Sequence, residues 1–389
     1  MKKFCLLLIC IVANAHAGRP RRVLRVPQDF TLKQACHEIQ PSDAGIVFAP
    51  GTYSGDGYEN INVVRKRLII AGNSILGPVI IESDGGSNYL LDIDNYEHDL
   101  NISISGITIR HFNHSAKAAI TVRNCQNFQV IDCNLYNNTN RWESGGAVEV
   151  LNVERFTTIN STYEGNHARR GGGAVAVFLS EMKTDDCIFA YNTTGGNGGA
   201  IDLFSATFFT TGSDYHHNMT FTGGNGGAIN LAQSSTYFAS GSIRHNSAAS
   251  GKGGGVYSTN SMGTFSETII NDNHTYGGLA TGPDMYIEDS CQKRNTFVFD
   301  GLGIYGNRAI VVLPDHPPTN AQLVEITAET MAANPDLDDE ALQHLILSEY
   351  YRQIMPSREI KLDGKSITLH FDYNRWLDMQ KTWQDSITN

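Results

Sequence analysis

The sequence predicts an all-β fold: a single-stranded right-handed parallel β-helix, which is a solenoid of stacked coils, within a chain of 389 residues. Two motifs carry this prediction because they recur in phase. The first is Gly-Gly-Ala followed by Val or Ile, which begins at Gly145, Gly172, Gly198 and Gly226, with a degenerate copy at Gly253. The second is a hydrophobic residue three positions before an asparagine, and these asparagines are Asn138, Asn166, Asn192, Asn218, Asn246 and Asn273.

Both motifs repeat every 26–28 residues, and such a period indicates a repeat architecture. The segments between them are short, rich in β-forming residues and partly alternating, as in residues 147–150. No helical pattern separates them, which excludes helical solenoids and βαβ units. A propeller blade needs roughly 40 residues, so a coil of three short strands and three turns fits best.

Stacking explains why these residue types recur. One coil cannot bury its inner face alone, whereas neighbouring coils about 4.8 Å apart bury a continuous core. Paired glycines permit tight turns with positive φ, and an asparagine inside a corner hydrogen-bonds the backbone of adjacent coils. The hydrophobic residues of the second motif are expected to point inward: Leu135, Tyr163, Phe189, Tyr215, Ile243 and Ile270.

The chain begins with a segment that is typical of a secretory signal peptide, residues 1–17. Lys2 and Lys3 precede a short apolar run, and small residues surround the expected cleavage point after Ala17. The run is far shorter than the ~20 residues that cross a bilayer, and no later stretch is long and apolar enough. We therefore expect no transmembrane segment, and a secreted protein that is extracellular or on the cell surface.

Residues 18–313 are expected to form the β-helix. At its start, residues 29–39 predict a short amphipathic helix with Leu32, Ala35, Cys36 and Ile39 on one face. Such a helix covers the open end of a solenoid core. Strand-and-turn units without the glycine motif follow at 46–53, 68–72 and 106–110.

Residues 314–389 are expected to form a C-terminal cap or extension. Pro314, Pro317 and Pro318 mark the break where the repeat ends. An amphipathic helix is predicted for 336–355, followed by a strand at 366–371 and a second helix near 374–386.

Composition excludes several classes of protein. Hydrophobic content of 41% excludes a mostly disordered chain, and a net charge of −11 argues against nucleic acid as a partner. No CxxC pair and no calcium-loop motif occur, so neither a metal nor a cofactor is predicted. Cys133 and Cys187 lie two coils apart, about 9.6 Å, which is too far for a disulfide. They are expected to be small packing residues.

Two segments resemble known families. Residues 48–53 (Phe-Ala-Pro-Gly-Thr-Tyr), after the first helix, are similar to the entry coils of the pectin-lyase-like superfamily of right-handed parallel β-helices. The central repeats resemble the chlamydial polymorphic outer-membrane protein repeat, and only residues 189–192 match its Phe-x-x-Asn form strictly. The resemblance covers roughly residues 24–312. It implies a surface-exposed, adhesin-like protein.

Aligning the coils on the repeated asparagine shows a candidate site. The position before it holds Tyr191, His217, His245 and Asp272 on successive coils, and His216 and Arg244 stand one position earlier. Groups stacked at about 4.8 Å can share a proton or bind an anionic sugar. His217, His245, Asp272 and Arg244 are the catalytic candidates, whereas His216 and Tyr191 are binding candidates. A solvated outer turn explains the same pattern.

A second outward column, two residues after each Gly-Gly-Ala, contains Glu149 and Asp202 and is expected to form a ridge suited to saccharides. Ordinary sheet surface explains this column equally well. Two functions stay open. The first is a binding protein whose partner is an extracellular glycan or a cell-surface receptor. The second is a polysaccharide lyase or glycoside hydrolase that acts on acidic polysaccharide.

Overall fold

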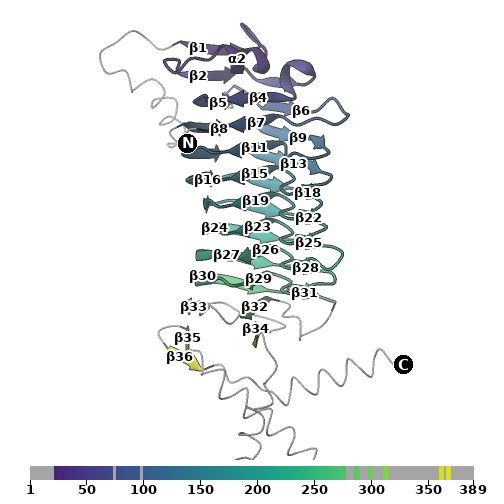
Figure 1. The fold of residues 1–389 in the computed structure, drawn as a ribbon, viewed down its shortest axis with the longest axis vertical. Coiled ribbons are helices and arrows are strands. Elements are labelled where there is room, and N and C mark those ends of the chain that lie inside the picture. Colours follow the sequence, from purple (N-terminus) through teal and green to yellow (C-terminus); the bar gives the residue numbers. More distant parts are fainter. Residues whose placement is uncertain are drawn as a thin grey trace, which may run out of the picture.

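The chain folds as a parallel β-helix, as the sequence predicts, with strands stacked along one axis (Figure 1). The computed structural model describes the following residues: 22–72, 76–96, 100–276, 284–289, 297–300, 310–314, 359–362 and 365–368. The expected signal peptide (1–17) and the expected helices at 336–355 and 374–386 lie outside these residues. Within the described part, no helix combines the length and the apolar character that a membrane span requires.

Three parallel sheets form the walls of the solenoid. The central coils each contribute one strand to sheet B and a two-residue strand to sheet C. Sheet B consists of β4 (Ile61–Val64), β7 (Leu91–Asp94), β11 (Ile120–Arg123), β15 (Val148–Leu151), β19 (Val175–Phe178), β23 (Ile201–Phe204), β26 (Ile229–Ala232), β29 (Val256–Thr259), β32 (Met285–Asp289) and β34 (Ile310–Pro314). Sheet C consists of β10 (Asn113–His114), β14 (Thr139–Asn140), β18 (His167–Ala168), β22 (Thr193–Thr194), β25 (Met219–Thr220), β28 (Ser247–Ala248) and β31 (His274–Thr275).

Sheet A is the widest wall, because most coils give it two short strands or one long strand. It consists of β1 (Val23–Val26), β2 (Gly45–Phe48), β3 (Gly51–Tyr53), β5 (Leu68–Gly72), β6 (Val79–Glu82), β8 (Asn101–Ser105), β9 (Thr108–Arg110), β12 (Asn127–Ile131), β13 (Asn134–Tyr136), β16 (Arg155–Ile159), β17 (Thr162–Glu164), β20 (Glu181–Asp185), β21 (Ile188–Ala190), β24 (Thr207–His216), β27 (Ser235–Arg244), β30 (Met262–Asn271) and β33 (Phe297–Asp300). Outside the solenoid sheets, β35 (Glu359–Leu362) pairs antiparallel with β36 (Lys365–Thr368), which overlaps the predicted strand at 366–371.

The predicted N-terminal helix is α2 (Leu32–Glu38), followed by a short 3-10 helix, η1 (Asp56–Tyr58). A capping box starts α2: the Thr31 hydroxyl accepts from the Gln34 N–H at 3.3 Å, and the Gln34 side chain accepts from the Thr31 N–H at 2.9 Å. The predicted apolar face is buried and packs toward β1, β2 and β4. Its residues are Leu32, Ala35, Cys36 and Ile39.

The interior is a column of stacked side chains. The six hydrophobic residues expected to point inward are all at most 2% exposed: Leu135, Tyr163, Phe189, Tyr215, Ile243 and Ile270. Within this column the Phe189 ring stacks on Tyr163 at 4.7 Å and on Tyr215 at 5.0 Å between centroids. Stacked aromatic rings stabilise a fold beyond the apolar area that they bury. Neighbouring coils are therefore held together through the core as well as through the sheets.

The cysteines of the core are free thiols. Cys133 and Cys187 point inward as small packing residues, as predicted, and the Cys187 Sγ lies 3.4 Å from the Thr158 carbonyl oxygen. Burial raises the pKa of Cys133 to about 12, so this thiol stays protonated and unreactive. Cys36 and Cys125 are also buried and free, whereas Cys291 lies outside the described residues.

Gly172 and Gly173 show why the repeat begins with two glycines. Gly172 has φ +59°, and a Cβ there would lie 2.1 Å from the Val175 carbonyl oxygen. At Gly173 a Cβ would lie 2.2 Å from the carbonyl oxygen of Gly199 in the next coil. The first glycine therefore makes the turn, and the second allows adjacent turns to stack at the spacing of the sheets.

The repeated asparagines form a continuous internal ladder. The backbone N–H and Nδ2 of Asn192 both donate to the Asn218 Oδ1 at 3.0 Å, and Nδ2 also donates to the Tyr163 carbonyl oxygen at 2.9 Å. Its own Oδ1 accepts two hydrogen bonds from Asn166. Six asparagines share this role, all 0% exposed: Asn138, Asn166, Asn192, Asn218, Asn246 and Asn273. We call this the asparagine ladder.

An aspartate takes the place of the next asparagine. The Oδ1 of Asp284 accepts from the backbone N–H of Asn273 at 3.3 Å and from its Nδ2 at 3.0 Å. Asp284 is 1% exposed, and burial raises the pKa of its carboxyl group. The Asp284 Oδ1 thus occupies the acceptor position that an asparagine Oδ1 occupies on the other rungs. Its second carboxylate oxygen, Oδ2, has no hydrogen-bond partner among the described residues.

Replacing one rung should destabilise the fold sharply. We expect Asn192→Ala to lower the free energy of unfolding by roughly 3 kcal/mol, because it leaves buried donors and acceptors of both neighbouring coils unpaired. Urea unfolding followed by circular dichroism measures the change. Asn127→Ala is the matched control, since Asn127 donates a single exposed hydrogen bond to Asn101 at 2.7 Å. Equal losses in the two variants would contradict a special role for the ladder.

Candidate functional site

The corner that precedes the asparagine ladder presents the first candidate site. Its residues adopt a left-handed conformation, which turns each side chain outward just before the inward asparagine. Their φ values are 51° at Asn137, 65° at Gly165, 55° at Tyr191, 55° at His217, 54° at His245 and 53° at Asp272. Asn, Asp and His are enriched in this conformation, so the backbone explains part of the residue pattern seen in the sequence.

Three aromatic rings of this corner form a row on the surface. The Tyr191 ring stacks on His217 at 4.9 Å with an interplanar angle of 18°, and the His217 and His245 rings lie 5.3 Å apart at 32°. Tyr191 is 53% exposed, and both histidines are also exposed. The predicted neighbours on successive coils therefore touch.

Charged groups of β24 and β27 lie beside this row. The strands place His216 opposite Arg244 and Asp214 opposite Ser242. The Arg244 Nη2 donates to the Asp214 Oδ2 at 2.7 Å, and the Ser242 hydroxyl donates to Oδ1. The His216 Nε2 is 4.0 Å from the same carboxylate. We call the following group the histidine patch: Tyr191, Asp214, His216, His217, Arg244 and His245.

Two neighbouring imidazoles of the patch share a hydrogen bond. The Nδ1 atoms of His216 and His217 lie 3.0 Å apart, so one must donate and the other must accept. Burial, together with His216, His245 and Arg244, lowers the pKa of His217. Burial alone would raise the pKa of Asp214, but hydrogen bonds from Arg244 and Ser242 hold it below the usual range. The patch is thus built around one ionised carboxylate.

Asp272 and Asp214 differ from what the sequence pattern indicates. Asp272 continues the row by its backbone, but its carboxylate is turned to the neighbouring side chain, and its Oδ2 accepts from the Asn271 Nδ2 at 2.8 Å. Asp214 was not among the predicted site residues, although it stands two positions before His216 and therefore on the same face of the strand. Within the described part of the chain, no three His, Cys, Asp or Glu side chains are arranged to hold a metal ion.

The second predicted column is also assembled by the sheet. In sheet B, Thr121 lies opposite Asp92 and Glu149, Ala176 lies between Glu149 and Asp202, and Asn230 follows Asp202. The expectation of an exposed ridge is wrong, however. Ala176 is 0% exposed and Asn230 is 3% exposed. We call this column the covered strip: Asp92, Thr121, Glu149, Ala176, Asp202 and Asn230.

The glycine turns cover this strip. The backbone of Gly171 passes so close to Asp202 that a Cβ on Gly171 would lie 2.1 Å from the Asp202 Oδ2. A side chain at position 171 would therefore have to displace either the Asp202 carboxylate or the turn. Sequence periodicity identifies which residues share a column, but it does not show how closely a turn lies against that column.

Two of the three acids of the covered strip have raised pKa values. Burial raises the pKa of Glu149 to about 7, with Glu143 and Asp92 adding to the shift and Arg123 opposing it. Burial raises the pKa of Asp202 to about 6, although the Asn230 Nδ2 donates to its Oδ1 at 2.6 Å. Asp92 differs, because Lys117 and Arg123 each contact its carboxylate at 2.5 Å.

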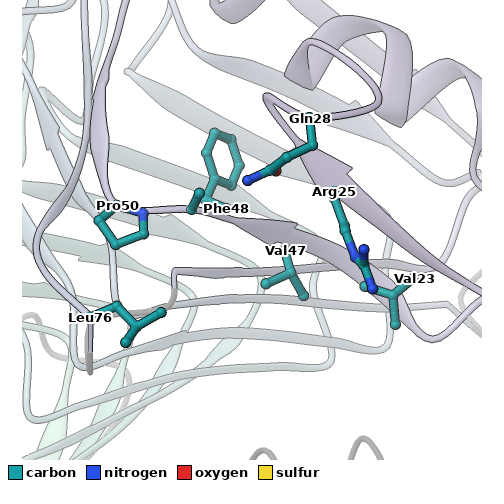
Figure 2. Close-up of a pocket in the computed structure, with 8 residues that line it drawn as sticks. Val23, Arg25, Gln28, Val47, Phe48, Pro50 and Leu76 are labelled. Atoms are coloured by element: carbon teal, nitrogen blue, oxygen red, sulfur yellow. The ribbon is translucent and has the colours of Figure 1, made fainter.

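A pocket lies elsewhere, at the N-terminal end of the solenoid, where residues of β1 and β2 and Leu76 line it (Figure 2). Its volume is about 230 Å³, and Arg25 and Gln28 supply its polar groups beside Phe48, Pro50 and Leu76. Arg25 and Leu76 are exposed. Apart from these two polar side chains the lining is apolar, and it includes none of the residues predicted for a site.

The chain was also compared with known proteins. No family model matches it, and neither the curated proteins nor the solved structures gave a match.

Partly buried acids with raised pKa values make stability fall as pH rises. In the folded state Glu149 and Asp202 hold protons above the pH at which an unfolded chain releases them, so their stabilising contribution is complete near pH 4 and is lost through about pH 6–7. We expect Glu149→Gln and Asp202→Asn each to recover on the order of 1 kcal/mol at pH 8 and little at pH 4. Urea unfolding at both pH values measures this.

The matched control for this pH dependence is Glu154→Gln, which changes an exposed carboxylate three residues beyond β15. It should leave the difference between pH 4 and pH 8 unchanged. If Glu149→Gln and Asp202→Asn also leave that difference unchanged, the covered strip does not control the pH dependence of stability.

Proposed function

We propose that this protein is a secreted β-helix protein that binds acidic glycans, or a cell surface that carries them, through the histidine patch. The observation that carries the proposal is the exposed row of stacked rings, Tyr191, His217 and His245, beside the guanidinium of Arg244. Flat aromatic faces provide apolar contact to a sugar ring, and polar atoms at their edges fix its orientation. A guanidinium has donors that match a carboxylate or a sulfate.

Other features favour the same role. Arg244 is 46% exposed at its side chain and uses one donor nitrogen on Asp214, which leaves further N–H groups for a ligand. Repeats that resemble the chlamydial polymorphic outer-membrane protein repeat support an adhesin-like protein of the pectin-lyase-like superfamily. Residues 1–17 support secretion. The partner would then be an extracellular glycan or a cell-surface receptor.

Binding to immobilised acidic polysaccharides tests this proposal. We expect Arg244→Gln and Tyr191→Asn each to weaken binding about tenfold, the first by removing a charge-assisted hydrogen bond and the second by removing a ring. Asparagine is chosen at 191 because it tolerates the left-handed conformation. Arg155→Gln is the control, since Arg155 is also exposed on sheet A and ion-paired, with Glu181 at 3.1 Å. An unchanged affinity in both Arg244→Gln and Tyr191→Asn would overturn the proposal.

The covered strip favours a second candidate function, hydrolysis of an acidic polysaccharide. Glycoside hydrolysis needs one carboxylic acid that is protonated and one carboxylate at a defined separation. Glu149, with its pKa raised to about 7, suits the acid, and Asp202 stands two strands away in the same column. Both are half-buried. A substrate would have to displace the turn at Gly171 to reach them.

Release of reducing ends from uronate-containing polysaccharides tests hydrolysis directly. If the strip is catalytic, Glu149→Gln and Asp202→Asn should each lower turnover at least about 100-fold, because general acid catalysis contributes that much or more. Arg244→Gln changes a residue of sheet A, outside the strip, and should leave kcat unchanged. Turnover that survives both acid variants, or no turnover with any of these polysaccharides, would remove this candidate.

A further inference from the structure

The histidine patch is a local centre of variable positive charge on an acidic chain. The whole sequence carries a net charge of −11, whereas the patch contains a single carboxylate, that of Asp214, beside one arginine and three histidines. Arg244 and Asp214 balance each other near neutral pH. An imidazole gains one positive charge when it is protonated, so mild acid makes a patch of three neighbouring imidazoles more positive.

The hydrogen bond between two imidazoles opposes full protonation of the patch as long as no anion is bound. His216 and His217 face each other through their Nδ1 atoms at 3.0 Å, and one proton is held between them. When both rings are doubly protonated, two N–H groups point at each other and repel. An acceptor with negative charge that contacts both rings relieves this repulsion. The His217 ring also stacks on His245, which brings the third imidazole into the same space.

The groups around these rings favour an anion over a cation. On the preceding coil the neighbour is the uncharged Tyr191, 53% exposed. On the following coil Asp272 is engaged by Asn271 at 2.8 Å. Glu164 lies two coils before His216 in the register of sheet A, with Ala190 between them. No acid other than Asp214 contacts the imidazoles within the described residues.

We propose that the histidine patch is an acid-switched anion site: in mildly acidic solution it binds sulfate- or carboxylate-bearing chains, and it releases them at neutral to alkaline pH. This rests on the proposed function, and it adds the ligand's charge and the condition for binding. Linkage gives the mechanism, because the coupling is reciprocal. An anion that binds the protonated rings more tightly raises the proton affinity of the rings, and protonation of the rings raises the affinity for the anion. The lowered pKa of His217 in the free protein is the shift that a bound anion reverses.

Dextran sulfate is the probe for the test, with uncharged dextran beside it, and affinity is measured at pH 5.5 and pH 8. The wild-type protein should bind dextran sulfate at least about tenfold more tightly at pH 5.5, which is within the usual range of coupling between sites. The variant His217→Asn/His245→Asn should lose most of that ratio. Asparagine keeps the left-handed backbone of both positions, so the fold is expected to be retained.

His111→Asn is the matched control. His111 has φ 63° and is exposed, and it precedes Phe112, whose N–H donates to the ladder at Asn138. The substitution therefore removes a histidine from the same kind of corner outside the patch, and it should leave the pH ratio intact. If the double variant and the control keep the same ratio, the effect comes from the charge of the whole chain and the switch is wrong.

The remaining outcomes separate the two proposals. Binding that is independent of pH but lost in Arg244→Gln overturns the switch and leaves the proposed function standing. Absence of binding to dextran sulfate and to the acidic polysaccharides at both pH values overturns both. Equal binding of uncharged dextran at pH 5.5 overturns the anion site, since a neutral chain gains nothing from protonated rings.

Discussion

The asparagine ladder is the interaction on which the other features of this structure depend. A buried amide must satisfy two donors and an acceptor, and each rung does so only when the next coil sits in one register. Asn192, for example, is bound by Asn166 on one side and binds Asn218 on the other. A shift by one residue would leave several buried polar groups unpaired at once, so the ladder fixes the register of the coils more strictly than apolar packing does.

A fixed register turns sequence position into spatial position. His216 and Arg244 are 28 residues apart in the chain but lie opposite each other in sheet A. The same rule brings Glu149 and Asp202 into one column of sheet B. The outcomes differ because of the turns: the corner before the ladder is a tight left-handed bend that exposes its side chains, whereas the glycine turns lie against sheet B and cover the acids.

These contrasts separate the features of the molecule that can be predicted from its sequence from those that cannot. The fold, the inward Phe189 and the buried face of α2 follow from a period that every coil repeats. The contact of Tyr191, His217 and His245 follows in the same way. The burial of Ala176 does not, because periodicity shows which residues share a column but not how closely other backbone lies against that column. Asp214 was missed because its role depends on Arg244, a partner on the next coil.

Tyr191 is a residue that the left-handed corner does not favour but that gives the surface an aromatic ring. The left-handed corner accommodates Asn137, Asp272 and Gly165 readily. A tyrosine with φ 55° costs on the order of 1 kcal/mol there. Stacking on His217 offsets part of this cost. The ring is therefore held in one orientation before any ligand arrives, and a surface that is ordered in advance loses less conformational entropy when it binds.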